Sequence, residues 1–138
     1  MHLEKLSMCM SMLKIANGKV QMSSAGMPPI FIYKKDERVI EEHVIKGMPL
    51  GTMQDFPYVL KESELNTGDS ILIMSDGFPE LLNDKNEAFG YKRVRNLFEE
   101  HSAKSPEDII SVLRKTGDEW TNNAEPDDDI TFVVIKVK

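Results

Sequence analysis

The sequence predicts an α+β fold, because segments that favour strands and segments that favour helices are separated along the chain. Strand patterns occupy most of the first 74 residues, helical patterns lie between residues 78 and 120, and one strand follows at 130–137. The chain has 138 residues, of which 41% are hydrophobic and 29% are charged. This size and composition are typical of a single globular domain with its own core.

The first part of the chain alternates apolar and polar residues, which is typical of strands with one buried face. The alternation begins at 6–12, and Asn17-Gly18 then predicts a two-residue hairpin. A return strand through 20–22 and further strands at 30–33 and 38–44 follow. We expect these strands to form an antiparallel meander in which the apolar side of 6–12 is buried.

Ile71–Met74 is a run of four apolar residues, which predicts a strand buried on both faces. The segment Tyr58–Leu65 also favours a strand, and the turn residues of 66–69 separate the two. We therefore expect 58–65 and 71–74 to pair with each other across this turn. The glycine- and proline-containing segment 47–51 is expected to be a loop.

Helical patterns follow the strands. Phe78–Leu82 is expected to form a short helix, and apolar residues at helical spacing predict a longer helix through 91–98. Ser105-Pro106 predicts the start of another helix, because serine is a good N-cap and proline is tolerated in the first turn. The β-branched segment Ile130–Val137 then predicts a strand that returns to the sheet.

Asp76 is the first candidate for a functional residue, since it directly follows the buried strand 71–74. A carboxylate at the end of a buried strand is costly to desolvate, and a bound divalent cation is one partner that offsets this cost. The simpler alternative is a turn residue that caps the next helix through its side-chain oxygen, since Asp-Gly is a common turn pair.

A second acidic segment, 127–129, precedes the last strand and contains three consecutive aspartates. Adjacent carboxylates repel one another, so the segment is either a solvated loop or a site that positive charge compensates. If the two strands are neighbours, Asp76 and Asp128 could share an oxygen-ligated ion. A purely structural role for both acidic loops would require the two residues to lie far apart.

Four segments in this order resemble the signature motifs of the metal-dependent PPM-type protein serine/threonine phosphatases. The similarity is strongest to the bacterial branch of sporulation stage II protein E and the sigma-B regulator phosphatases, and it runs from about Leu6 to Lys138. The four segments are Ser24-Ala25-Gly26-Met27-Pro28-Pro29, Gly47-Met48-Pro49-Leu50-Gly51, Ser75-Asp76-Gly77-Phe78-Pro79-Glu80 and Asp128-Asp129-Ile130-Thr131. The resemblance implies a β-sandwich of mostly antiparallel strands flanked by helices, with a metal site at one edge.

The resemblance also implies roles for individual residues. Asp76 and Asp128 correspond to ligands of a two-metal site that holds Mn²⁺ or Mg²⁺, and Gly77 would support these ligands. Asp129 would either support them as well or be a loop-end residue. No covalent enzyme nucleophile is implied. The implied reaction is hydrolysis of phosphoserine or phosphothreonine on a small regulatory protein, such as an anti-anti-sigma factor.

Two departures from the family pattern qualify this expectation. Met27 stands where the branch usually has histidine. The Asp-containing motif that precedes these segments in a complete catalytic domain is not found in residues 1–138. We therefore expect residues 1–138 to be a single domain that forms the C-terminal part of a phosphatase domain and to be inactive alone. The alternative is a catalytically inactive, phosphatase-like module that binds proteins.

The composition of the chain limits the classes of partner that it is expected to bind. A formal net charge of -6 argues against a broad nucleic-acid surface, which needs clustered lysine and arginine. No apolar run approaches the length of a membrane span, and the single Cys9 favours a reducing cytoplasm. The expected partners are a phosphorylated regulatory protein and an upstream sensor or regulatory domain of the same protein. An unpaired strand edge and an exposed apolar face would also allow a homodimer.

Overall fold

The computed structural model describes residues 6–138, which form two compact units. One unit contains the chain up to Pro29 together with Val44–Leu65, and the other contains Ile30–His43 together with Asn66–Lys138. Each unit is built around one antiparallel sheet, and both helices belong to the second unit. The predicted α+β class is therefore confirmed.

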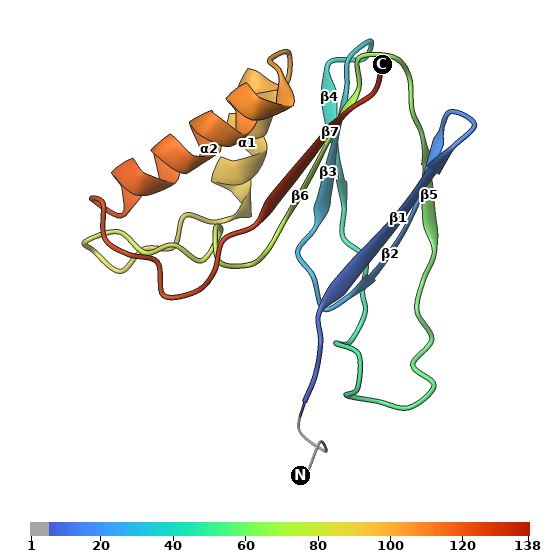
Figure 1. Cartoon of the computed structure of the whole chain (residues 1–138), viewed down its shortest axis with the longest axis horizontal. Coiled ribbons are helices and arrows are strands. Elements are labelled where there is room, and N and C mark those ends of the chain that lie inside the picture. The colour runs from blue at the N-terminus through green and yellow to red at the C-terminus, as the bar shows by residue number, and fades with distance from the viewer. Residues whose placement is uncertain (1–5) are drawn as a thin grey trace. The chain divides into compact units, whose positions relative to one another are not determined.

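The sheet of the first unit has the strand order β1-β2-β5, with β1 at Met10–Ala16, β2 at Lys19–Ala25 and β5 at Lys61–Glu64 (Figure 1). β1 and β2 form the predicted hairpin. Its turn residues Asn17 and Gly18 have φ angles of 52° and 70°, which is the left-handed conformation that such a turn requires.

The predicted pairing of 58–65 with 71–74 is wrong, because β5 pairs with β2 instead. The two segments differ in the surroundings they need. β5 has charged residues on its exposed side, and its Glu62 accepts a hydrogen bond from Lys19 of β2 at 3.2 Å. The apolar segment 71–74 instead requires a sheet neighbour on each side and cover on both faces.

The second sheet has the order β4-β3-β6-β7, and every neighbouring pair in it is antiparallel. Its strands are β3 at Ile30–Lys34, β4 at Val39–His43, β6 at Ser70–Met74 and β7 at Phe132–Lys136. The predicted continuous meander is wrong, because β2 and β3 belong to different sheets. The chain leaves the first sheet at Gly26, whose φ is 72°, and Pro28-Pro29 cannot donate ladder hydrogen bonds.

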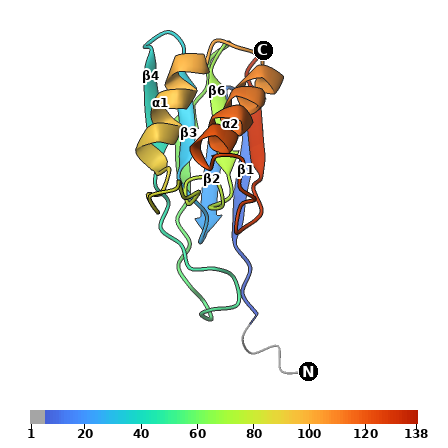
Figure 2. The same ribbon diagram turned by 90° about the vertical axis from the view of Figure 1, so that its left-hand side faces the viewer.

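Two helices, α1 at Tyr91–His101 and α2 at Pro106–Trp120, lie over one face of this sheet (Figure 2). The predicted cap of α2 is confirmed, because Ser105 Oγ accepts a hydrogen bond from the Asp108 N–H at 3.2 Å. The core between the helices and the sheet consists of buried apolar residues. They are Phe31, Ile40, Leu72, Met74, Phe78, Leu81, Phe89, Val94, Phe98, Ile109 and Leu113. Within the described range, neither helix is both long and apolar enough to cross a membrane.

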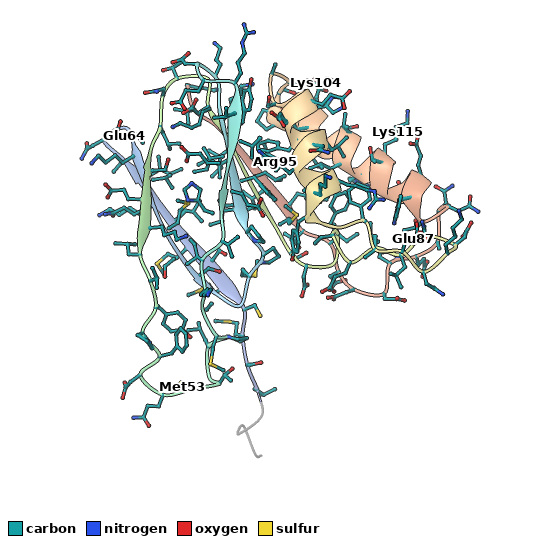
Figure 3. The ribbon with its side chains drawn as sticks, turned by 180° about the vertical axis from the view of Figure 1, so that it is seen from behind. Met53, Glu64, Glu87, Arg95, Lys104 and Lys115 are labelled. Atoms are coloured by element: carbon teal, nitrogen blue, oxygen red, sulfur yellow. The ribbon has the colours of Figure 1, made fainter. Side chains whose placement is uncertain are left out.

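The predicted short helix at 78–82 is wrong, because residues 76–80 form turns that begin a compact loop before α1. Phe78 points into the core, where its ring lies 5.0 Å from that of Phe89. The Trp120 indole N–H at the end of α2 donates to the carbonyls of Leu81 and Glu87, at 3.0 and 3.3 Å. Figure 3 shows Glu87 on this loop, near the C-terminal end of α2. Tertiary packing therefore holds the loop in a non-helical form.

The apolar side of 6–12 is exposed, contrary to the prediction. Leu6, Met8 and Met12 are 69%, 55% and 61% exposed. The alternation in this segment is real, and β1 does form a strand from Met10 onward. The prediction fails because the described residues provide nothing that covers this side of β1.

Candidate functional site

The two acidic segments meet at one end of the β6–β7 pair. β6 and β7 run antiparallel, so the last residue of β6, Met74, pairs with the first residue of β7, Phe132. The Ser75 N–H then donates to the Thr131 carbonyl at 3.0 Å. Asp76 lies one residue beyond this bond, and Asp128 lies three residues before it in the chain. The structure therefore brings the two predicted site segments together at one end of the sheet.

Ser75 and Gly77 hold these segments against each other. Ser75 Oγ donates to the Asp129 carbonyl at 3.1 Å and accepts a hydrogen bond from the Thr131 N–H at 2.9 Å. A Cβ on Gly77 would overlap the Asp129 carbonyl oxygen and would lie 3.3 Å from the Asp128 carbonyl oxygen. Ser75 was not predicted as a site residue, although its position directly before Asp76 was a signal in the sequence.

The carboxylates of Asp76 and Asp128 have few protein partners. Within residues 6–138, Asp76 makes no side-chain hydrogen bond, and Asp128 Oδ1 accepts only from the N–H of Asp129, at 2.8 Å. The capping role considered for Asp76 is therefore not observed: its carboxylate makes no cap bond, and no helix follows directly.

An acid-lined hollow of about 490 Å³ opens beside Gly77 and Asp128, one residue from each of the two segments. Five acidic residues line it: Glu80, Asp84, Glu125, Asp127 and Asp128. No lysine, arginine or histidine is among its lining residues in the described part of the chain. Such a surface repels an anion unless cations are bound to it.

The negative charge of this region also affects Tyr91, the first residue of α1. Burial raises the pKa of the Tyr91 phenol, and the nearby carboxylates of Glu80 and Asp76 raise it further. Tyr91 thus lies within electrostatic range of Asp76, although the two are fifteen positions apart in the sequence. The loop between β6 and α1 brings them together.

The donor type fits Mg²⁺ or Mn²⁺, since both prefer carboxylate oxygens. The described side chains are too few at this place to surround a metal ion. Among residues 6–138, no group of three or more histidine, cysteine, aspartate or glutamate side chains is arranged to hold a metal ion. The side chains of residues 6–138 therefore do not form a complete metal site by themselves.

The other two predicted motifs meet in the first unit. The Gly26 N–H donates to the Gly47 carbonyl at 2.7 Å, and a Cβ on Gly47 would overlap the Ser24 carbonyl oxygen. These glycines allow the chain after β2 to pack tightly against the segment 47–51. The predicted loop at 47–51 is observed, apart from the isolated bridge between Leu50 and Met8.

Comparison with known proteins identifies the family. The family model described as stage II sporulation protein E (SpoIIE) matches residues 4–138, which is nearly the whole chain. The chain belongs to the SpoIIE family. It is 28% identical to the phosphoserine phosphatase RsbU of Bacillus subtilis (strain 168) over 121 residues, which cover 84% of this chain and 34% of RsbU.

Solved structures support the SpoIIE-family fold. The SiaA-PP2C domain of Pseudomonas aeruginosa matches with a TM-score of 0.75 and 19% identity over 88% of this chain and 47% of that one. The manganese-presoaked phosphatase domain of SpoIIE from Bacillus subtilis matches with a TM-score of 0.69 and 19% identity. That match covers 95% of this chain and 56% of the other. The chain thus spans about a third of RsbU and about half of these two structures.

We expect Asp76→Asn to leave the free energy of unfolding within about 0.5 kcal/mol of the original value, or to raise it. The Asp76 carboxylate makes no hydrogen bond in the described structure and lies near other negative charges, so neutralising it removes repulsion. Thermal melts without metal test this, with Asp127→Asn as the matched control. A strong loss of stability would mean that Asp76 has a structural role.

Gly77→Ala is expected to lower stability by about 1–3 kcal/mol, which is typical of overpacking. The added methyl group would meet the Asp129 carbonyl, and backbone cannot move aside as cheaply as a flexible side chain. The two acidic segments would separate, so Mn²⁺ binding should weaken as well. Calorimetric titration and thermal melts measure both effects. Unchanged values in both experiments would show that the close contact is unimportant.

Proposed function

We propose that this chain is part of a metal-dependent protein phosphatase that hydrolyses phosphoserine or phosphothreonine on a regulatory protein, within a larger signalling protein. The observation that carries the proposal is the meeting of the Asp76 and Asp128 segments beside the acid-lined hollow. A phosphate group would be repelled there unless cations were bound. Metal-dependent chemistry is therefore the kind that suits this surface.

Asp76 and Asp128 would hold Mn²⁺ or Mg²⁺ in this proposal. Bound divalent cations neutralise phosphoryl oxygens and lower the pKa of water so that it can act as the nucleophile. Ser75 and Gly77 position the ligands, because they fix the backbone of 128–131 against that of 75–77. Asp129 contributes its carbonyl oxygen to this contact, which agrees with a supporting role. One solved structure of the SpoIIE phosphatase domain is described as manganese-presoaked.

The substrate class comes from the relatives. RsbU is described as a phosphoserine phosphatase, and the SpoIIE structures are of a phosphatase domain. We infer a phosphorylated regulatory protein as substrate, of the anti-anti-sigma kind that the motif resemblance implied. An upstream sensor or regulatory domain would then control the site. A cytoplasmic location remains a prediction from the single Cys9.

One observation favours a second candidate, an inactive phosphatase-like module that binds proteins. The described residues contain no cluster of three metal-binding side chains. If no further ligands are supplied from elsewhere, the fold could act only through protein contacts.

Hydrolysis of p-nitrophenyl phosphate and of a phosphoserine protein in Mn²⁺ tests the two candidates. The comparison is between residues 1–138 and a chain extended upstream to the length of the matching phosphatase domains. We expect turnover only from the extended chain, and loss of that turnover when the metal is removed with a chelator. Inactivity of both chains would favour the binding module. Robust turnover by residues 1–138, abolished by Asp76→Asn, would show that the two carboxylates suffice.

A further inference from the structure

The C-terminal end of α2 is connected to both of the segments that carry Asp76 and Asp128. Trp120 is the last residue of α2, and the chain continues directly from it into the segment of Asp128. Its indole N–H donates to the loop that follows Asp76, at the carbonyls of Leu81 and Glu87. One residue therefore begins the segment of one acidic site and contacts the loop of the other.

A small hairpin lies in the loop before α1, and Trp120 bonds to both of its sides. On one side, the Leu81 carbonyl accepts a hydrogen bond from the Phe89 N–H at 2.8 Å. On the other side, the Glu87 carbonyl accepts one from the Asn83 N–H at 3.1 Å. The Trp120 N–H donates to the same two carbonyls, at 3.0 and 3.3 Å. The indole thus connects the hairpin to α2 at two points.

The same hairpin supports the turn that carries Asp76. The Asp76 carbonyl accepts a hydrogen bond from the Glu80 N–H at 3.2 Å, and the Gly90 N–H, just after the hairpin, donates to the Pro79 carbonyl at 2.8 Å. The Asp76 carboxylate itself accepts no hydrogen bond within residues 6–138. The position of this carboxylate therefore depends on how firmly the turn and the hairpin are fixed.

Arg93 of α1 stabilises the position of the Trp120 ring. The guanidinium carbon of Arg93 lies 4.5 Å from the centre of that ring, which is a favourable cation–π contact. Arg93 Nη1 also donates to the Phe89 carbonyl at 2.9 Å. The Phe89 ring meets the Trp120 ring edge-on, with 5.5 Å between the ring centres. Contacts from α1 and from the hairpin therefore fix the indole in one place.

We propose that Trp120 is a positioning residue for the metal site, whose N–H keeps the turn of Asp76 in place relative to the segment of Asp128. Ser75 fixes the chain before Asp76, and Trp120 fixes the chain after it. The inference rests on the proposed function, because it takes both aspartates as metal ligands. If the turn is in place in only a tenth of the molecules, the apparent affinity for Mn²⁺ falls about tenfold.

Trp120→Phe, in a chain extended to the length of the matching phosphatase domains, tests the proposal. Phenylalanine keeps an aromatic ring beside Arg93 but has no N–H to donate. In the metal-free protein, we expect hydrogen exchange at the Asn83 and Phe89 amides to become about tenfold faster, because local opening of the hairpin costs less free energy. Amides of β6 should keep their protection. Unchanged exchange at both hairpin amides would overturn the proposal.

Calorimetric titration of the same proteins with Mn²⁺ is the second measurement. Trp120→Phe should weaken Mn²⁺ binding about tenfold and raise the Mn²⁺ concentration for half-maximal turnover by the same factor. The kcat at saturating Mn²⁺ should change less than about threefold, because bound metal favours the conformation in which the turn is in place. This separation of metal affinity from kcat is not expected of a residue that only stabilises the fold.

Ile40→Val is the matched control for stability. Ile40 is a buried core residue of β4, outside the hairpin and both acidic segments, and the smaller side chain weakens the same core. This variant should leave hairpin exchange and Mn²⁺ binding unchanged. Arg93→Lys is a second test variant, since it keeps the charge but loses the planar group that stacks on Trp120. It should weaken Mn²⁺ binding in the same direction as Trp120→Phe.

The outcomes separate this inference from the proposed function. Faster hairpin exchange with unchanged Mn²⁺ binding would overturn the positioning role of Trp120. Equal weakening of Mn²⁺ binding by Ile40→Val would overturn it too, because the effect would then follow general stability. If the extended chain binds Mn²⁺ but hydrolyses no substrate, the proposed function fails, and the exchange and titration results still decide the role of Trp120. An extended chain that binds no Mn²⁺ would overturn both.

Discussion

Replacing either Asp76 or Asp128 by asparagine, in a chain extended to the length of the matching phosphatase domains, is expected to lower kcat at least about 100-fold. Cation binding at a phosphoryl group stabilises the transition state by several kcal/mol, and each 1.36 kcal/mol corresponds to about tenfold in rate. Each carboxylate lies in one of the two segments that Ser75 joins. Neither variant should disturb that junction, because both side chains keep their size.

Asp127→Asn is the matched control for these variants. Asp127 is exposed in the same loop and lines the same hollow, but it lies outside the motif that contacts Ser75. The Asp127→Asn variant should retain most of the phosphatase activity at saturating Mn²⁺. Equal losses for Asp127 and Asp128 would mean that general negative charge, rather than a specific ligand, supports the reaction. Retained activity in Asp76→Asn would contradict the metal-ligand assignment.

Asp69→Asn is expected to lower the free energy of unfolding at neutral pH by about 3–5 kcal/mol, the range for breaking a buried ion pair. Asp69 Oδ2 lies 3.1 Å from Lys34 Nζ, and the two side chains are only 1% and 6% exposed. The same carboxylate accepts hydrogen bonds from the N–H groups of Lys35 and Asn66, each at 2.9 Å. An asparagine cannot replace both the charge and this set of acceptors.

The effect of Asp69 should depend on pH with a definite sign. Burial by itself would raise the pKa of Asp69, but the N–H groups of Asn66 and Lys35 and the Lys34 ammonium outweigh it and hold the pKa below its ordinary value. Because the pKa of Asp69 is lowered in the folded state, its carboxylate contributes fully to stability above the pKa of the unfolded chain, which is about 3.9. This contribution to stability is lost as the pH falls through the pKa of the folded state.

Urea denaturation at pH 7 and near pH 3 measures this difference. The difference in free energy of unfolding between the original chain and the Asp69→Asn variant should be large at pH 7 and smaller near pH 3. Asp36→Asn, an exposed site on the neighbouring turn, should stay within about 0.5 kcal/mol at both values. A gap of the same size at both pH values would show that Asp69 acts through shape and not through its charge.

The local patterns in the sequence predicted individual elements well. Asn17-Gly18 marked the hairpin because both residues tolerate positive φ, and Ser105-Pro106 marked the start of α2 because capping is a local interaction. The Asp76 and Asp128 segments were selected by their position at strand ends. β6 and β7 are indeed neighbours, and the two segments meet.

Pairing and loop shape were predicted less well. Strand propensity was visible in 58–65, but its partner depended on which sheet had an open edge, and β2 supplied that edge. The helical pattern of 78–82 did not produce a helix. Phe78 packs into the core instead, and the Trp120 indole N–H donates a hydrogen bond to a carbonyl of this loop. Such outcomes depend on residues far away in the chain.

The sequence by itself therefore determined the α+β class and the family motifs, and it selected the two acidic segments that meet at the end of the β6–β7 pair, because spacing, turn chemistry and residue type are local properties. Only the tertiary structure decided which strands pair, that Ser75 and Gly77 join the two acidic segments, and that the apolar side of 6–12 is exposed. These features depend on contacts between residues that are distant in sequence. Burial and pairing are collective properties of the folded chain, and a period-two pattern shows that a strand has an apolar side without showing what covers it.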